Sequence, residues 1–211
     1  QTLHSYSIAT AYEAKQLAKS ILQQGYRKTI IIYDNSSYHT KTLEHFSKHF
    51  TNNGGSIVAT TAATGNINAK ISNILGIGTS QSHYSQLTKI SNEKIRFSPE
   101  RRTDFDNIVI IASSEKARQI NPMLHYHFAD DVPIFGFSSI INPIADSKKD
   151  KDLNGIIFFD SGSITKKKLS FGQKIQKSIQ QFNPKEFARN SRYNALGIDA
   201  YLITKLSYLW Q

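Results

Sequence analysis

Apolar residues in the first part of the chain recur as a repeated unit of amphipathic helix followed by a short apolar run. Residues 11–24 carry apolar side chains at i, i+3, i+4, i+7 and i+8, and Gly25 follows, which is typical of a helix ended by a residue with positive φ. The run 28–34 is rich in β-branched residues without alternation, as expected of a strand buried on both faces. A helix over 38–52 and a strand over 56–62 repeat the unit. This alternation predicts an α/β fold, a parallel sheet with helices on both faces.

A third unit follows a polar helical stretch. The run 107–112 predicts a buried strand, and Ser113 or Ser114 is a natural N-cap for a helix over 114–124. Pro122 removes one helical hydrogen bond, so we expect a kink or an early end there.

The remainder of the chain changes character. Residues 132–138 predict a fourth strand, 155–160 one more strand, and 191–210 a C-terminal helix. We therefore predict an α/β lobe over 8–138 and, over 139–211, a return segment toward another lobe that ends in the C-terminal helix.

Composition narrows the class of protein. The 211 residues contain no cysteine, which excludes disulfides and thiolate metal sites. No apolar run approaches the ~18 residues of a membrane span. The chain begins without methionine or a signal-peptide pattern, as expected of a piece of a longer processed protein.

The net charge of +10 indicates an anionic partner or surface. Residues 161–185 hold six lysines and no acid, for which a solvated basic face is the simpler interpretation and a dedicated binding patch the alternative. The lysines are Lys166, Lys167, Lys168, Lys174, Lys177 and Lys185.

Candidate catalytic and metal-binding motifs are weak. His45 and His49 have the i, i+4 spacing of helical metal ligands, but Glu44 precedes the first histidine and no third ligand is obvious, so an exposed helix face is favoured. His125 and His127 flank Tyr126 near a helix end, where a structural role is the simpler interpretation. No phosphate-binding glycine loop or G-x-S-x-G elbow is present. We expect no catalytic residue, no metal site and no cofactor.

Polar residues gather instead where the predicted strands end. Ligands of open α/β sheets bind beyond the carboxyl ends of the strands, and hydroxyls beside a helix N-terminus suit a small polar or anionic ligand. Simple helix capping by the serines is an equally good interpretation. The candidate ligand- or partner-binding residues are Tyr33, Asp34, Asn35, Ser36, Ser113, Ser114, Ser138 and Ser139.

The stretch from Arg101 to Ile140 resembles the LppC/LpoA family, the lipoprotein activators of penicillin-binding proteins. DLNG at 152–155, Phe159-Asp160, Leu75-Gly76, Phe97-Ser98-Pro99 and the helix 192–201 agree with the family pattern. Ser161-Gly162 departs from it, because the family carries an aromatic residue there. The matching residues are Arg101, Arg102, Asp104, Asp106, Ala112, Ala117, Arg118, Ile120, Pro122, Ala129, Asp131, Pro133 and Ser139.

The resemblance implies a type I periplasmic-binding-protein-like fold, present as one lobe plus an incomplete second lobe. It implies a non-enzymatic periplasmic regulator in peptidoglycan biosynthesis, and hence in cell wall growth and cell shape, that stimulates a class A penicillin-binding protein by direct contact. The parent lipoprotein would be attached to the outer membrane through its lipidated N-terminus. Its only membrane contact would be that anchor.

Other functions stay open. A periplasmic solute-binding protein or receptor lobe that closes on a small polar ligand uses the same fold, and fold does not decide function. Peptidoglycan itself is a further partner to consider, whereas nucleic acid is disfavoured, since no basic recognition helix or aromatic-studded strand is present.

The charged loop before the third strand is expected to have a structural role. Arg101 or Arg102 can pair with Asp104 or Asp106, and Arg118 is placed to reach an acid such as Asp104 or Asp130.

Overall fold

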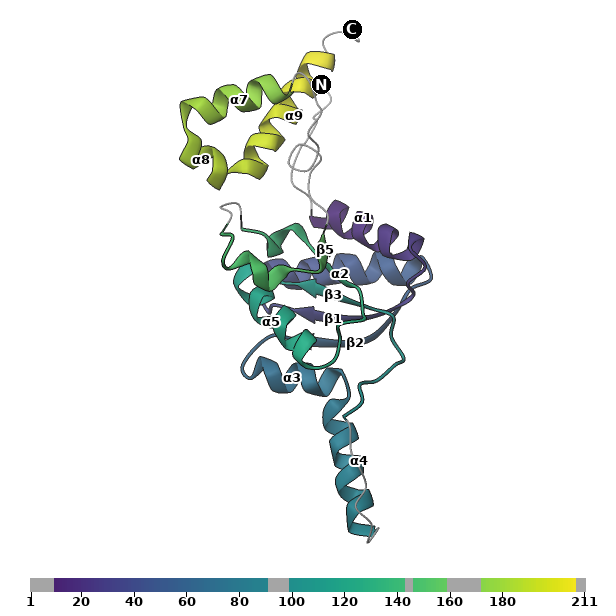
Figure 1. Cartoon of the computed structure of the whole chain (residues 1–211). Coiled ribbons are helices and arrows are strands. Elements are labelled where there is room, and N and C mark those ends of the chain that lie inside the picture. The colour runs from purple at the N-terminus through teal and green to yellow at the C-terminus, as the bar shows by residue number, and fades with distance from the viewer. Residues whose placement is uncertain (1–9, 91–98, 143–145, 159–171, 208–211) are drawn as a thin grey trace. The chain divides into compact units, whose positions relative to one another are not determined.

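The computed structural model describes residues 10–90, 99–142, 146–158 and 172–207 (Figure 1). Its internal contacts divide the chain into two compact units. The larger unit comprises residues 10–141 and 146–159, and the smaller one comprises 160–211 with 1–9 and 142–145. The candidate binding residues all belong to the larger unit.

The larger unit is built on a five-stranded sheet in the order β2-β1-β3-β4-β5. Every adjacent pair of these strands is parallel, which confirms the predicted sheet. The third strand pairs with the first in register, Thr29 opposite Asn107 through Tyr33 opposite Ile111. The strands are β1 (Lys28–Tyr33), β2 (Ser56–Ala62), β3 (Asn107–Ile111), β4 (Ile134–Gly136) and β5 (Ile156–Phe158).

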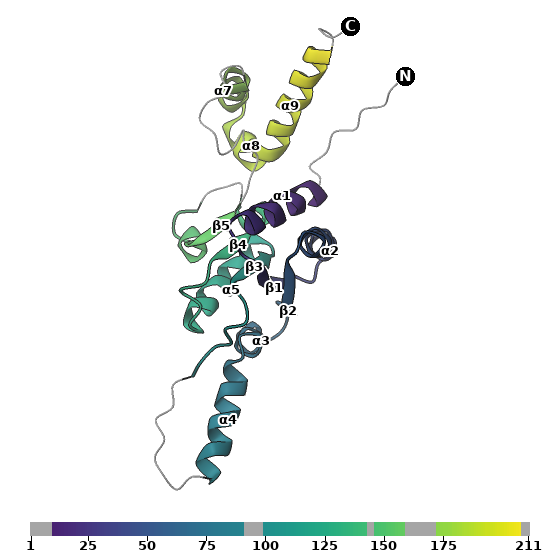
Figure 2. The ribbon, with the colours of Figure 1, turned by 90° about the vertical axis from the view of Figure 1, so that its right-hand side faces the viewer.

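Helices cover both faces of this sheet, as predicted (Figure 2). On one face lie α1 (Thr10–Gln23) and α2 (Ser37–Asn52), and on the other lie α3 (Ile67–Ile74) and α5 (Ser114–Tyr126). Successive strand residues alternate between two hydrophobic clusters: Ile31 joins the α1–α2 side, and Ile30 and Ile32 the opposite side. Both faces of the sheet are therefore packed against apolar side chains of the helices, which explains why the central strands have continuous apolar sequences.

The helix boundaries follow local rules. Gly25 ends α1 with φ +93°, and Gly54 follows α2 with φ +87°, both in the left-handed region that glycine adopts most easily. Of the two effects expected of Pro122, a kink or an early end, the early end is wrong, because α5 runs on to Tyr126. Pro122 is exposed, and water can satisfy a helical carbonyl left without a donor on the solvent side.

The other described elements are helices. In the larger unit, α4 (Ile77–Ile90) follows α3, while 3-10 helices η1 (Ser138–Ile140) and η2 (Asp150–Leu153) follow β4. The smaller unit holds α7 (Gly172–Phe182), α8 (Pro184–Arg189) and α9 (Ser191–Ser207). Among the residues that the structure describes, no helix is both long enough and apolar enough to cross a membrane. Lys166, Lys167 and Lys168 lie outside the described residues.

The charged loop before β3 has the expected structural role, with a partly different pairing. Arg102 pairs with Asp104 at 2.6 Å, as expected, whereas Arg101 pairs with Asp131 at 2.5 Å. Asp106 pairs with neither arginine, because its carboxylate accepts hydrogen bonds from the backbone N–H of Arg27 (2.7 Å) and of Lys28. It thus ties the start of β1 to the start of β3.

Arg118 has a different partner from the two acids expected. Its Nη2 atom lies 2.7 Å from Oδ1 of Asp150, in η2. The expected acids are engaged elsewhere, Asp104 with Arg102 and Asp130 with His125. The pair was hidden from the sequence because α5 and η2 are brought together only by the fold.

Candidate functional site

The candidate residues lie at the carboxyl edge of the sheet, where the strand order changes direction. The chain leaves β1 for β2 on one side and leaves β3 for β4 on the other, although β1 and β3 are neighbours. Such a switch point is the usual ligand crevice of an open α/β sheet, because two helices begin there and diverge. Here the two helices are α2 and α5.

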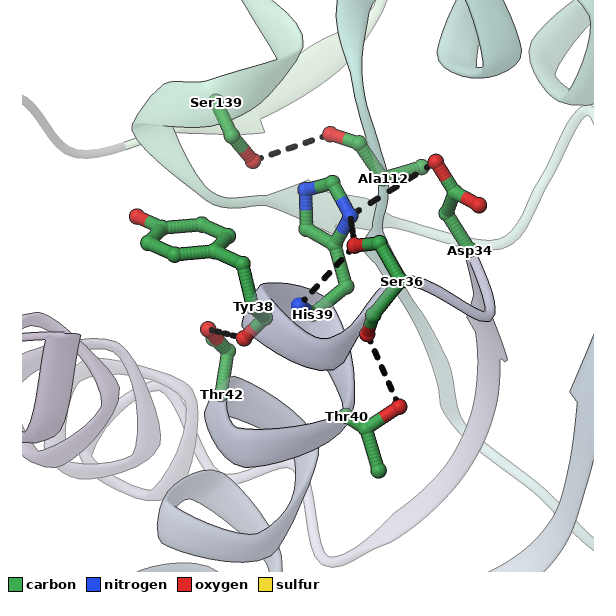
Figure 3. Close-up of polar contacts among 8 residues, drawn as sticks. All are labelled: Asp34, Ser36, Tyr38, His39, Thr40, Thr42, Ala112 and Ser139. Carbon is green, nitrogen blue, oxygen red and sulfur yellow. Dashed lines mark hydrogen bonds and ion pairs between the residues drawn. The ribbon is translucent and has the colours of Figure 1, made fainter.

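At the start of α2, Ser36 and His39 form a closed local arrangement (Figure 3). Ser36 is the N-cap, and its Oγ atom accepts a hydrogen bond from the His39 N–H at 3.2 Å. The same Oγ atom lies 2.7 Å from His39 Nδ1, and Oδ2 of Asp34 lies 3.6 Å from that nitrogen. The first turn of α2 is therefore held by two side chains of the short segment that joins β1 to α2.

The His39 ring is buried, and burial lowers its pKa, partly offset by the nearby Asp34 carboxylate, which raises it. The neutral ring is thereby favoured. The hydrogen bond between Ser36 Oγ and Nδ1 fits either neutral tautomer, because a hydroxyl has one proton to donate and two lone pairs that accept. Among the described residues, buried Nε2 has no hydrogen-bond partner.

These three side chains do not form a catalytic relay. A Ser-His-Asp relay needs the serine on one ring nitrogen and the acid on the other, so that a proton taken by the first is stabilised through the second. Ser36 and Asp34 both face Nδ1 of His39. Their arrangement caps a helix and orients a ring.

At the start of α5, Ser113 occupies the N-cap position but makes no side-chain capping hydrogen bond. Ser114 is the first helical residue, and both serines are half-buried. The N-terminal amides of this 13-residue helix therefore keep the capacity to donate to an anion.

After β4, Ser138 and Ser139 make contacts inside the fold. Ser139 Oγ donates to the backbone carbonyl of Ala112 at 2.9 Å, which ties η1 to the end of β3 (Figure 3). The backbone N–H of Ser138 donates to Oε1 of Glu13 at 2.5 Å, and the Ser138 hydroxyl lies 3.2 Å from Oε2. A carboxylate from α1 thus caps η1.

The structure brings only part of the predicted set together. Asp34 and Ser36 share His39, and Ser139 reaches the end of β3. Tyr33 instead packs against the hydrophobic cluster on the α1–α2 side, and Asn35 is exposed. Two residues at this edge were missed from the sequence.

His39 is the first missed residue, and a signal for it existed. A histidine three positions after an N-cap serine can meet the serine side chain, because the N-cap oxygen faces the third helical residue. Glu13 is the second, and it had no comparable signal. It lies 125 positions from Ser138 along the chain, and only the packed fold brings them together.

The remaining histidines have ordinary surroundings. His45 and His49 are half-buried on α2, and the residues that the structure describes contain no group of three metal-ligating side chains. His125 Nδ1 lies 2.6 Å from Asp130 Oδ1, and His127 Nε2 lies 2.6 Å from Asn68 Oδ1. Burial lowers the pKa of His127.

The chain matches a known protein family over its whole length. The model of the family described as "LppC putative lipoprotein" matches residues 1–211. The penicillin-binding protein activator LpoA of Photobacterium profundum is 26% identical over 200 residues, covering 93% of this chain and 32% of that protein. The LpoA of Vibrio cholerae is 24% identical over 197 residues. The chain thus spans about a third of the length of the curated relatives it matches.

Two solved structures show the same fold. The LpoA C-domain of Haemophilus influenzae, described as a regulator of PBP1A, has a TM-score of 0.59 and 15% identity, and the match covers 100% of this chain and 60% of that one. An ABC transporter substrate-binding protein of Desulfitobacterium hafniense has a TM-score of 0.60 and 16% identity, covering 93% and 48%. The fold is periplasmic-binding-protein-like, as the resemblance implied.

Proposed function

Because this chain belongs to the LppC lipoprotein family, we propose that it is a non-enzymatic regulator that stimulates a class A penicillin-binding protein by direct contact. The observation that carries this proposal is the family match over the whole chain, together with curated relatives named as activators of penicillin-binding proteins. The fold shared with a solved regulatory C-domain supports it.

The geometry of the sheet edge supports a role without catalysis. Ser36, Asp34 and His39 are arranged as a cap and not as a relay, and a regulator needs only a shaped surface. Periplasmic location, with attachment to the outer membrane through a lipidated N-terminus of the parent protein, is part of the same proposal and rests on the lipoprotein family. So is the division into a lobe over 8–138 and a return segment over 139–211.

The test is a reconstituted synthesis reaction. A purified class A penicillin-binding protein is given its lipid-linked precursor with and without this chain, and glycan polymerisation and cross-linking are followed separately. We expect the chain to raise at least one rate at a saturable concentration and to turn over no precursor alone. An unchanged rate together with no binding by surface plasmon resonance would contradict the proposal.

A second candidate function is the binding of a small polar ligand at the carboxyl edge of the sheet. One observation favours it: the Ser113 hydroxyl makes no capping bond, which leaves the first N–H groups of α5 able to donate to a ligand carboxylate. The site would draw on the candidate residues Asp34, Ser36, Ser113, Ser114, Ser138 and Ser139.

Thermal shift measurements separate the two functions. The panel consists of free amino acids and peptidoglycan stem peptides, with a Ser113→Ala variant as the binding test and a Thr51→Ala variant, at the far end of α2, as the control. A melting-point rise lost only in Ser113→Ala favours ligand binding. If no compound raises the melting temperature while synthase stimulation persists, only the regulator function is supported.

A further inference from the structure

The outer surface between α1 and α2 holds a groove of about 560 Å³ that has no part in the sheet edge described above. The two helices pack side by side on one face of the sheet (Figures 1 and 2). The groove is lined by Lys15, Ala18, Lys19 and Leu22 from α1, by Arg27 from the following turn, and by His49 from α2. No carboxylate lines it.

The cations of this groove have no ion-pair partner among the residues that the structure describes. Lys15 and Lys19 are exposed and, within the part of the chain that the structure describes, neither has a carboxylate within ion-pair distance. The Arg27 guanidinium donates to the backbone carbonyl of Leu22 at 2.9 Å, which uses one of its five N–H groups. By contrast, Arg101, Arg102 and Arg118 each pair with an aspartate.

Lys15 and Lys19 stand at positions i and i+4 of one helix, so their like charges repel each other. Arg27 adds a third positive charge to the same groove. Such an arrangement costs stability in the isolated protein, and a partner with negative charges removes that cost.

The floor of the groove is apolar. Ala18 is buried and Leu22 is half-buried, and both line the groove together with Lys15, Lys19 and Arg27. A floor of this kind with a charged rim suits a segment that has apolar side chains as well as carboxylates.

Other anions fit less well. The groove runs to the C-terminal ends of α1 and α2, at Gln23 and Asn53, where the helix dipoles carry partial negative charge and disfavour a compact phosphate. Its lining holds no Phe, Tyr or Trp side chain on which a nucleobase could stack. An extended chain can instead place its carboxylates near Lys15 and Lys19.

We propose that the α1–α2 groove docks an acidic polypeptide segment that also carries small apolar side chains. The inference goes beyond the proposed function, because it concerns the chemistry of one surface and does not require the partner to be a penicillin-binding protein.

The test uses a fluorescent random copolymer of glutamate and alanine as the probe and follows its anisotropy. The test variant carries Lys15→Glu and Lys19→Glu. The matched control carries Lys89→Glu and Lys151→Glu, two exposed lysines outside the groove, and therefore has the same net charge. Both are compared with the wild-type chain after circular dichroism shows the native melting curve.

We expect the groove variant to bind the copolymer about tenfold more weakly than the control at ~0.15 M salt, since two ion pairs are replaced by repulsions. The difference should disappear at ~1 M salt, where the screening length falls to about 3 Å. Equal loss in both variants would overturn the proposal, because net charge alone would then explain binding. So would duplex DNA or anionic phospholipid vesicles that bind more tightly than the copolymer and lose that binding only in the groove variant.

Discussion

Two sets of cations in the larger unit are held in opposite ways. Arg101, Arg102 and Arg118, around β3 and α5, each have an aspartate partner at 2.5 to 2.7 Å. Lys15 and Lys19, on α1, have no such partner among the described residues. The position of a cation in the fold therefore decides whether it forms an ion pair or remains available at the surface. Arg101 and Arg118 join segments that are distant in sequence, where the planar guanidinium meets an acid, whereas Lys15 and Lys19 face solvent.

The three ion pairs differ in how far they are buried, and most of all in the exposure of the aspartate. The Arg118 side chain is 13% exposed and its partner Asp150 is 31% exposed, whereas the partner of Arg101, Asp131, is 72% exposed. Burial decides the cost of breaking a pair, because a partner left in a dry site cannot regain water. The cost of removing each arginine should therefore follow the burial of its pair.

The largest effect is expected for Arg118→Ala. The substitution leaves the Asp150 carboxylate without its 2.7 Å partner and loosens η2 from α5, where Asn121 Nδ2 also donates to the carbonyls of Asp152 and Asn154. We expect a loss of about 2–3 kcal/mol in the free energy of unfolding. Urea denaturation measures it, with Lys116→Ala on the same helix as the control. A loss no larger than that of the control would contradict the importance of the pair.

Arg101→Ala is expected to cost less. Its Nε atom donates to the carbonyl of Phe128 at 2.8 Å, and its guanidinium carbon lies 5.5 Å from the centre of the Phe105 ring. Because Asp131 is mostly exposed, the hydrogen bond and the ring contact should dominate, giving about 1–2 kcal/mol. An Asp131→Asn variant should cost clearly less than Arg101→Ala. Equal costs would mean that the ion pair carries the effect.

The Arg118–Asp150 pair also predicts a pH dependence. The hydrogen bond from Arg118, with a further one from the Asp146 backbone, lowers the pKa of Asp150 below 3.8. A lowered carboxyl pKa gives stability that is present above 3.8 and is lost as pH falls through the value in the folded protein. Urea unfolding from about pH 5 downward should therefore show a steeper loss for the wild-type chain than for Arg118→Ala. Parallel pH profiles would contradict this linkage.

The smallest effects are expected for Arg102→Ala and Lys19→Ala. In the Arg102–Asp104 pair the arginine side chain is 33% exposed and the aspartate 53%, so its loss should cost about 0–1 kcal/mol. Lys19→Ala should change the free energy of unfolding by no more than about 0.5 kcal/mol, and at low salt it should stabilise the chain by relieving repulsion with Lys15. Thermal unfolding of both variants at two salt concentrations measures the loss in the first and the salt-dependent change in the second. A clearly destabilised Lys19→Ala variant would show that the groove cations serve the fold.

Much of this protein follows from its sequence alone, because the rules involved are local. The unbroken apolar run of β3 predicts a strand buried on both faces, since neither side of it could face water. Gly25 and Ser36 mark a helix end and a helix start through backbone geometry that depends only on neighbouring residues. Even His39, although overlooked, lies within three residues of the serine that it contacts.

Only the tertiary structure decided the contacts between distant segments. Glu13 meets Ser138 across 125 positions, and Arg118 meets Asp150 across 32. No periodicity encodes such pairs, because each depends on how a helix lies on the sheet and on which of several acids is already engaged. The same holds for the groove between α1 and α2. Lys15, Lys19 and Arg27 are unremarkable along the chain, and they become one acid-free surface only where two helices pack together.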